Sequence, residues 1–179
     1  LTALQQANEG PFSNETINKL FNEIFRATLN MEEQDARQKI LVQRKRPDQQ
    51  TVIEFDNGLT IGDGSFSIIA GPCAVESYEQ MDAAAAALSA RGVKMIRGMG
   101  YKPRTSPYDF QGLGEEGLKI ARQVANNYDM VVISEVLDQS LIPMMDEYVD
   151  AFWVGARNMQ NGFLLRALGR QNKPVLLKR

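Results

Sequence analysis

From residue 66 to residue 177 the sequence repeats one pattern, in which a short apolar run is followed by a longer amphipathic segment. The apolar runs predict buried strands over residues 66–70, 93–96, 130–134, 151–154 and 174–177. The segments between them predict helices over residues 77–90, 115–127, 137–148 and 159–168. Pro143 breaks the pattern of the third helix, and Gly169 ends the fourth. Continuous apolar strands that alternate with helices form parallel sheets covered on both faces. The sequence therefore predicts an α/β fold built of βα units.

The residues before this repeat have a different organisation. A helix is expected from Pro11 to about Glu33, capped by Ser13 or Asn14, with an apolar side made of Ile17, Leu20, Phe21, Ile24, Phe25 and Leu29. Residues 34–50 are polar and basic and indicate a linker, and the turn signature at 56–58 predicts a short hairpin over residues 51–61. We expect a boundary after residue 33, a linker to residue 50, and one α/β domain over 51–179.

Two folds compete for the βα pattern. A doubly wound sheet needs a glycine-rich phosphate loop after its first strand, and residues 70–73 lack the required spacing. A (β/α)8 barrel instead carries its chemistry where each strand ends. Polar or charged residues follow every predicted strand here, namely Cys73 and Glu76, Arg97 to Thr105, Glu135, Arg157 and Asn158, and Lys178 and Arg179. The pattern favours part of a TIM barrel with about five βα units, and because a complete barrel has eight strands and about 250 residues, we expect a longer polypeptide.

Composition excludes several classes of partner. A net charge of −2 disfavours nucleic-acid binding, which calls for a basic excess. No apolar run of about 18 residues offers a membrane span. The single cysteine excludes an internal disulfide, and with no signal peptide visible we expect a cytoplasmic protein. The chain has no histidine, so acid–base and metal chemistry must use other side chains.

The loop after the second predicted strand concentrates positive charge. Arg97 and Arg104 can grip phosphate or carboxylate with two hydrogen bonds each, Lys102 adds a point charge, and Thr105 and Ser106 add hydroxyl donors. Prolines stiffen this loop. The arrangement suits a small phosphorylated substrate, although a solvated basic turn is the alternative.

Six motifs in the predicted barrel together resemble the DAHP synthase family, in its type I-beta branch. They are GPCAVES at 71–77, KPRTSP at 102–107, FQGLG at 110–114, SEV at 134–136, GARNMQN at 155–161 and KPVLLKR at 173–179. The resemblance implies a metal-dependent transferase of the shikimate pathway for aromatic amino acids. Its reaction condenses phosphoenolpyruvate with erythrose 4-phosphate to give 3-deoxy-D-arabino-heptulosonate 7-phosphate and phosphate.

The resemblance also implies roles for single residues. The cations that would hold phosphoenolpyruvate are Arg97, Lys102, Arg157 and Lys178, and the loop that would take the sugar phosphate is Lys102, Pro103, Arg104 and Thr105. Lys102 and Glu135 would handle protons, with a salt bridge to a site cation as the alternative for Glu135. Cys73 would be one ligand of a divalent metal ion such as manganese, iron or zinc, with a buried structural thiol as the alternative.

Two features depart from the family pattern. The family commonly has Gly-Gly-Ala where this chain has Gly98-Met99-Gly100, so Met99 either alters the substrate loop or packs beneath it. The family also completes its metal site with a histidine and two carboxylates from later strands. The 179 residues offer only Cys73, and we expect them to be inactive by themselves.

The N-terminal helix resembles the last helix of an all-α chorismate mutase module, which some DAHP synthases carry. The resemblance would place Thr28 and Glu32 at contacts with the polar groups of the mutase substrate, and it suggests feedback regulation. The apolar side of this helix needs partners, so we expect a homo-oligomer.

Three other functions stay open at this point. A sister synthase that uses arabinose 5-phosphate resembles the same barrel, but it typically has Asn where this chain has Pro103. The second alternative is a non-catalytic binding or regulatory domain. A plain structural α/β domain would leave the charged strand ends unexplained.

Overall fold

The computed structural model describes residues 6–38, 44 and 46–179, and it divides into two compact units, Leu1–Gln50 and Thr51–Arg179. The predicted division into a mutase-like module, a linker and a barrel segment remains a prediction.

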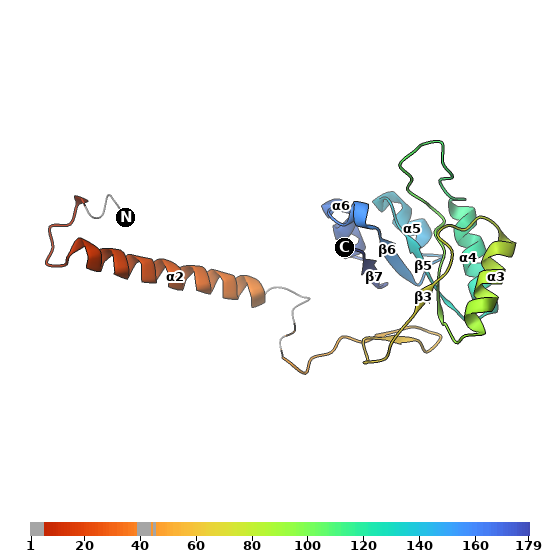
Figure 1. Ribbon diagram of the computed structural model, residues 1–179, viewed down its shortest axis with the longest axis horizontal. Helices are drawn as coiled ribbons and strands as arrows, with labels where there is room; N and C mark the ends of the chain where they lie inside the picture. Colours follow the sequence, from red (N-terminus) through yellow and green to blue (C-terminus); the bar gives the residue numbers. More distant parts are fainter. Residues whose placement is uncertain (1–5, 39–43, 45) are drawn as a thin grey trace. The chain divides into compact units, whose positions relative to one another are not determined.

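The second unit is built on a parallel sheet of five strands in chain order (Figure 1). The strands are β3 (Ile69–Ala70), β4 (Met95–Arg97), β5 (Val131–Glu135), β6 (Ala151–Val154) and β7 (Val175–Leu177). The connecting helices are α3 (Tyr78–Ser89), α4 (Glu115–Asn127), the short pair η1 (Gln139–Leu141) and α5 (Ile142–Met145), and η2 (Ala156–Asn158) with α6 (Gly162–Leu168). Sequential parallel strands joined by helices confirm the predicted barrel segment.

Side chains alternate between the two faces of this sheet. Ile96, Val132 and Phe152 point toward α3–α6 and form the larger core, in which Phe152 is completely buried. Met95 and Ile133 occupy the opposite face, which we call the inner face. Replacing a buried phenylalanine by alanine typically costs about 3–5 kcal/mol, so this core is a major source of stability.

A hairpin covers part of the inner face. Its strands are β1 (Ile53–Glu54) and β2 (Thr60–Ile61), paired antiparallel as the turn signature predicted. Phe55, Leu59 and Ile61 pack against the inner-face cluster, which includes Ala151. The hairpin therefore shields apolar side chains of the sheet from water.

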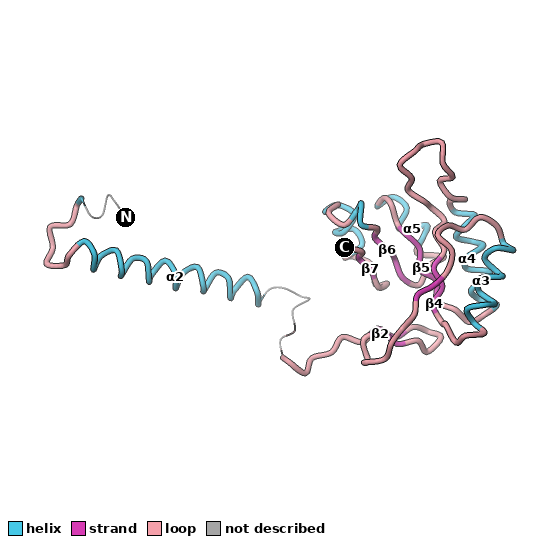
Figure 2. The backbone as a smooth tube through the Cα atoms, viewed as in Figure 1, coloured by secondary structure: helices cyan, strands magenta, loops and turns pink. Residues whose placement is uncertain are grey.

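Several predicted boundaries move. In Figure 2 the segment before β3 is loop, and Phe66 is 91% exposed although residues 66–70 were predicted as a strand. The reason is that β3 has one strand neighbour among the described residues, so little packing extends it. The last helix begins at Gly162 instead of Met159, because the Asn161 side chain caps it by accepting from the backbone N–H of Leu164.

Side chains cap the start of α3. The hydroxyl of Ser77 accepts from the backbone N–H of Gln80 at 3.1 Å, and the Gln80 side chain accepts from the N–H of Glu76 at 3.1 Å. The region around Pro143 is indeed a broken helix, formed by η1 and α5.

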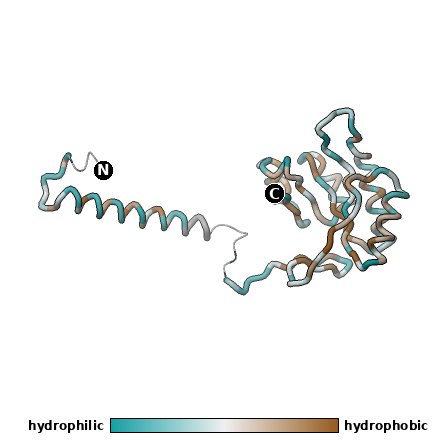
Figure 3. The backbone as a smooth tube through the Cα atoms, viewed as in Figure 1, coloured by the Kyte–Doolittle hydropathy of each residue, from teal (hydrophilic) through white to brown (hydrophobic). Residues whose placement is uncertain are grey.

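The first unit contains one long helix, α2 (Asn14–Gln38). Ser13 caps it, since its hydroxyl accepts from the N–H of Thr16 at 3.2 Å. The helix extends beyond the predicted end near Glu33 because no glycine or proline follows that residue before Pro47. Figure 3 shows apolar and hydrophilic residues recurring in turn along it. Its apolar residues Leu20, Ile24, Phe25 and Leu29 are exposed within this unit.

No helix among the described residues is long and apolar enough to cross a lipid bilayer.

Candidate active site

The carboxyl ends of three neighbouring strands bring polar side chains together on the inner face. Arg97 ends β4, Glu135 ends β5, and Trp153 lies opposite Glu135 in the register of β5 and β6. Each follows an inner-face residue by two positions, so alternation places all three on that face. This is the end of the sheet where a barrel carries its active site.

Glu135 and Lys102 form an ion pair at this edge. The ammonium nitrogen of Lys102 lies 3.9 Å from Oε2 of Glu135, and the two side chains are 17% and 9% exposed. A charge pair shielded from water interacts more strongly than one on the surface. Glu135 therefore forms the salt bridge to a site cation that was given as its alternative role. Its role in proton transfer remains a prediction.

Two contacts hold Arg97 in place. Its Nε donates to the carbonyl oxygen of Gly71 at 3.3 Å, and its Cζ lies 5.6 Å from the centroid of the Trp153 ring. A guanidinium over an indole face is an attractive cation–π arrangement. Arg97 has no acidic partner in the part of the chain that the structure describes, so its charge remains available to an anionic ligand.

The loop between β4 and α4 is closed at its base by backbone hydrogen bonds. The N–H of Lys102 donates to the carbonyl of Gln111, and the N–H of Gly114 donates to that of Gly100, both at 2.8 Å. Gly112 has φ +95°, and a Cβ there would lie 2.1 Å from the carbonyl oxygen of Gly100, so only glycine fits this closure. The base of the loop is thus fixed by the backbone.

Side chains brace the rest of this loop. The amide of Gln111 donates to the carbonyl oxygens of Ser106 and Asp109, both at 3.1 Å. Nε of Arg104 donates to the carbonyl of Phe110 at 3.3 Å. Arg104 and the predicted ligand Thr105 are exposed, while Lys102 and Pro103 are half-buried. The loop therefore presents its cations from an internally ordered scaffold.

The remaining predicted barrel residues follow strands at the same end. Arg157 lies in η2 after β6, and Lys178 follows β7, where its N–H donates to the carbonyl of Val154 at 3.0 Å. Both side chains are exposed, and no ion pair between described residues engages either charge. Cys73, after β3, is also exposed rather than buried in this structure.

A divalent metal ion is the group that the family resemblance implies. Among the residues that the structure describes, no three histidine, cysteine, aspartate or glutamate side chains are grouped so that they could hold one. These residues do not by themselves fit a metal centre, because Cys73 is a single donor.

The residues predicted for mutase-like contacts lie in the other unit. Thr28 and Glu32 are exposed on α2, and the hydroxyl of Thr28 donates to the carbonyl of Ile24 at 3.0 Å.

Two contacts that shape the site were not predicted from the sequence. The Sδ of Met99 accepts from the backbone N–H of Glu135 at 3.0 Å, and Oγ of Ser134 accepts from the N–H of Gly100 at 3.3 Å. Met99 is 2% exposed, so it packs beneath the loop, which decides between the two interpretations given for it. The only sequence signal was its departure from the family pattern.

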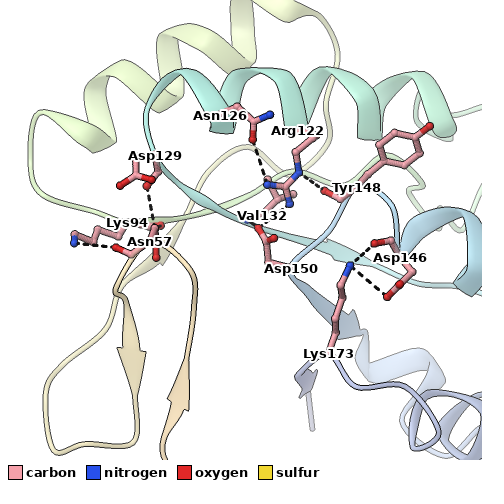
Figure 4. A network of polar contacts seen from close by, with 10 residues as sticks. All are labelled: Asn57, Lys94, Arg122, Asn126, Asp129, Val132, Asp146, Tyr148, Asp150 and Lys173. Carbon is pink, nitrogen blue, oxygen red and sulfur yellow. Dashed lines mark hydrogen bonds and ion pairs between the residues drawn. The ribbon is translucent and has the colours of Figure 1, made fainter.

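A cavity of about 440 Å³ opens at the opposite end of the strands and contains none of the predicted site residues. Arg122 lies in its wall and donates to Asp150 at 2.7 Å and to the carbonyl of Tyr148 at 2.8 Å (Figure 4). Oδ2 of Asp150 also accepts from the N–H of Val132 at 2.7 Å. These groups satisfy one another, so the network is structural.

The amide of Asn57 completes this polar region. It donates to the carbonyl oxygens of Lys94 at 3.2 Å and Asp129 at 2.9 Å. These contacts attach the hairpin to the residues that precede β4 and β5 (Figure 4). The hairpin thus supports the end of the sheet away from the candidate active site.

The parallel sheet of sequential βα units, with cations and one buried acid at its carboxyl edge, identifies the chain as a segment of a (β/α)8 barrel. The family model of the DAHP synthetase I family matches residues 50–179. The chain therefore belongs to the DAHP synthetase I family.

Individual relatives agree with this assignment. The chain is 51% identical over 139 residues to a phospho-2-dehydro-3-deoxyheptonate aldolase of Thermotoga maritima, covering 78% of this chain and 41% of that protein. It is 33% identical over 132 residues to a 2-dehydro-3-deoxyphosphooctonate aldolase of Methylibium petroleiphilum, covering 70% of this chain and 45% of that protein. The chain thus spans less than half the length of these curated relatives.

A solved structure shows the same fold. The crystal structure of the Thermotoga maritima DAHP synthase superposes with a TM-score of 0.73 at 50% identity, covering 78% of this chain and 40% of that chain. A likeness at this identity confirms both the fold class and the family.

Proposed function

We propose that this chain carries part of the active site of a 3-deoxy-D-arabino-heptulosonate 7-phosphate synthase. The observation that carries the proposal is the shielded pair of Lys102 and Glu135 at the carboxyl edge of the sheet. Arg97 ends β4, while Arg157 and Lys178 follow β6 and β7 at the same end of the sheet. None of these three cations has an acidic partner among the described residues. Two phosphorylated substrates need such a concentration of positive charge.

The proposed reaction forms one carbon–carbon bond and releases phosphate. C3 of phosphoenolpyruvate attacks the aldehyde carbon of erythrose 4-phosphate, and the aldehyde oxygen takes up a proton. One water molecule supplies the new oxygen at C2, and inorganic phosphate leaves from that carbon. Glu135 and Lys102 are the proposed proton-handling groups, since they lie together where water has limited access.

Each predicted residue keeps a proposed role. Arg97, Lys102, Arg157 and Lys178 bind phosphoenolpyruvate, and the residues that receive the sugar phosphate are Lys102, Pro103, Arg104 and Thr105. The exposed thiol of Cys73 supplies one ligand to a divalent metal ion, manganese, iron or zinc. The other ligands would have to come from residues outside the described set.

The sister synthase remains the second candidate for the substrate. Pro103 favours erythrose 4-phosphate, because the relatives of the arabinose 5-phosphate branch typically have Asn at that position. The higher identity to the Thermotoga heptonate enzyme, 51% against 33%, supports the same choice. A non-catalytic binding domain is the third candidate, and it would bind phosphoenolpyruvate without turnover.

The test is an assay of the full-length protein with phosphoenolpyruvate, a divalent metal and either aldose phosphate. We expect release of inorganic phosphate and a 3-deoxy sugar acid with erythrose 4-phosphate in preference to arabinose 5-phosphate. Lys102→Met should reduce turnover by at least about a hundredfold. Lys119→Met, which alters an exposed lysine of α4, is the matched control. Binding of phosphoenolpyruvate without phosphate release would contradict the proposal.

We further propose that α2 belongs to a mutase-like helical module that regulates the enzyme, with Thr28 and Glu32 contacting a pathway product. Its exposed apolar residues support association with further helices, including those of a second copy. Light scattering of the full-length protein measures the oligomeric state. A synthase activity that chorismate and prephenate leave unchanged would contradict the regulatory role.

A further inference from the structure

Gly155 follows β6 directly and is buried at the carboxyl edge of the sheet. Its backbone has φ −68° and ψ 158°, an extended conformation that any L-amino acid adopts without strain. A glycine is therefore not needed here for backbone freedom. What glycine provides at this position is space.

The space is occupied by the carboxylate of Glu135. A Cβ on residue 155 would lie 2.0 Å from Oε1 and 3.0 Å from Cδ of Glu135, far inside contact distance. The other oxygen, Oε2, is the atom that faces the ammonium group of Lys102 at 3.9 Å. The carboxylate thus lies between the α-carbon of Gly155 and Lys102.

The backbone of Glu135 has little freedom to move away from residue 155. It belongs to β5, pairs in register with Trp153 of β6, and its N–H donates to the sulfur of Met99. A side chain at position 155 would therefore displace the carboxylate, which can rotate about its own side-chain bonds, and would leave the strand in place.

We propose that Gly155 is a positioning residue for Glu135. By lacking a Cβ it admits the carboxylate to the place from which one oxygen faces Lys102. The position of the carboxylate follows from its close approach to Gly155 and its pairing with Lys102. The expected effect on catalysis rests on the proposed function of Lys102 and Glu135.

The test is Gly155→Ala in the full-length protein, with Gly162→Ala as the matched control. Gly162 lies at the start of α6, where a Cβ would meet nothing within 4 Å. Crystal structures of parent and variant give the separation of Oε2 of Glu135 and Nζ of Lys102. We expect it to exceed the limit of about 4 Å for an ion pair in Gly155→Ala and to stay unchanged in Gly162→Ala.

The kinetic result separates positioning from a merely structural role. For Gly155→Ala we expect kcat to fall at least about tenfold, because a proton-handling group is misplaced. The KM for phosphoenolpyruvate should change less than about threefold, since three of the four cations proposed to bind it, Arg97, Arg157 and Lys178, form no ion pair with Glu135 among the described residues. The melting temperature should stay near that of Gly162→Ala, because the carboxylate is the mobile end of a side chain.

A double variant checks that the effect passes through Glu135. Glu135→Asp shortens the side chain by one methylene and withdraws the carboxylate by about 1.5 Å from residue 155. Adding Gly155→Ala to Glu135→Asp should then change kcat by less than about twofold, although Gly155→Ala alone costs tenfold or more. Full additivity of the two changes would overturn the inference.

The remaining outcomes distinguish the positioning role of Gly155 from the proposed synthase function. A Gly155→Ala variant with parental kcat and an intact pair overturns the positioning role and leaves the proposed synthase function standing. A large drop in melting temperature in that variant shows a structural role and also overturns it. A parent protein that releases no phosphate overturns the proposed function alone, and the crystallographic separation then decides the geometric inference.

Discussion

The guanidinium carbon of Arg97 lies 5.6 Å from the ring centroid of Trp153, and Trp153 is the only tryptophan in the chain. An anion that binds Arg97 changes the electric field over the indole and competes with the cation–π contact. We therefore expect phosphoenolpyruvate to change the intensity or wavelength of tryptophan emission in a saturable manner. A fluorescence titration measures this directly.

Two variants identify the source of the signal. Arg97→Gln should abolish the saturable change, while Arg170→Gln, which alters an exposed arginine beyond α6, should preserve it. Calorimetric binding of phosphoenolpyruvate without any change in emission would show that the ligand does not reach Arg97.

The contacts of Arg122 predict a stability effect at the other end of the sheet. Arg122→Ala removes charged hydrogen bonds to Asp150 and to the carbonyl of Tyr148, and the Asp150 carboxylate is only 33% exposed. We expect a loss of about 2 kcal/mol in the free energy of unfolding, within the range for hydrogen bonds to charged groups. Urea denaturation gives the value.

The control for this prediction is Lys119→Ala. Lys119 pairs with Glu115 one helical turn away, and its side chain is 50% exposed. Exposed pairs contribute little to stability, so its unfolding midpoint should match that of the parent. Equal effects of the two variants would show that the Arg122 network is solvated rather than structural.

Asp63 predicts a dependence of stability on pH. Hydrogen bonds from the Ser65 hydroxyl, the Thr60 hydroxyl and the Ser65 N–H lower the pKa of Asp63 from 3.8 to about 2. Because the pKa is lower in the folded state, ionised Asp63 stabilises the fold above the unfolded pKa. This contribution is lost as the pH falls from about 4 through about 2.

The measurement compares the parent with Asp63→Asn. The stability advantage of the parent in urea denaturation should be constant above pH 5 and should shrink between about pH 4 and pH 2. Asp56→Asn is the matched control for the loss of a charge, because it changes an exposed carboxylate of the same hairpin that makes no hydrogen bond to a described residue. A constant difference between parent and Asp63→Asn at all pH values would contradict the assignment.

The order of the helices and strands was predictable because buried strands are visible in the sequence as runs of apolar residues. Strand β6 is a continuous apolar run and β5 begins as one. The polar and charged residues at the strand ends had to share one edge once the sheet was parallel. Strand ends were less predictable. Phe66 is as apolar as Phe152, but only Phe152 has neighbours on both sides in the sheet, and neighbours are a property of the fold.

The contacts inside the candidate site depend on register and approach, which composition does not encode. Nothing in the sequence indicates that Gly155 abuts the Glu135 carboxylate, since its backbone dihedral angles suit any residue. The pairing of Arg97 with Trp153 likewise arises because two strands place them on one face. The motifs predicted the cations, whereas the residues that orient them come together only in the folded chain.

Met99 offers a test of one such hidden contact. Its sulfur accepts from the backbone N–H of Glu135 at 3.0 Å, and both residues are buried. Met99→Leu keeps the volume of the side chain but removes the acceptor, which leaves a buried N–H unpaired. A buried donor left unpaired typically costs about 1–3 kcal/mol. Sulfur is a weak acceptor, so we expect the loss in the free energy of unfolding to lie near the lower end of this range.

Met145→Leu is the matched control, because Met145 is completely buried and its sulfur makes no hydrogen bond among the described residues. Volume-conserving exchanges of this kind usually cost less than about 1.5 kcal/mol, and that cost should be common to both variants. We expect Met99→Leu to lose about 1 kcal/mol more in the free energy of unfolding than Met145→Leu, together with faster amide hydrogen exchange at Glu135. Equal losses and unchanged exchange would mean that the sulfur fills space and does not accept the Glu135 N–H.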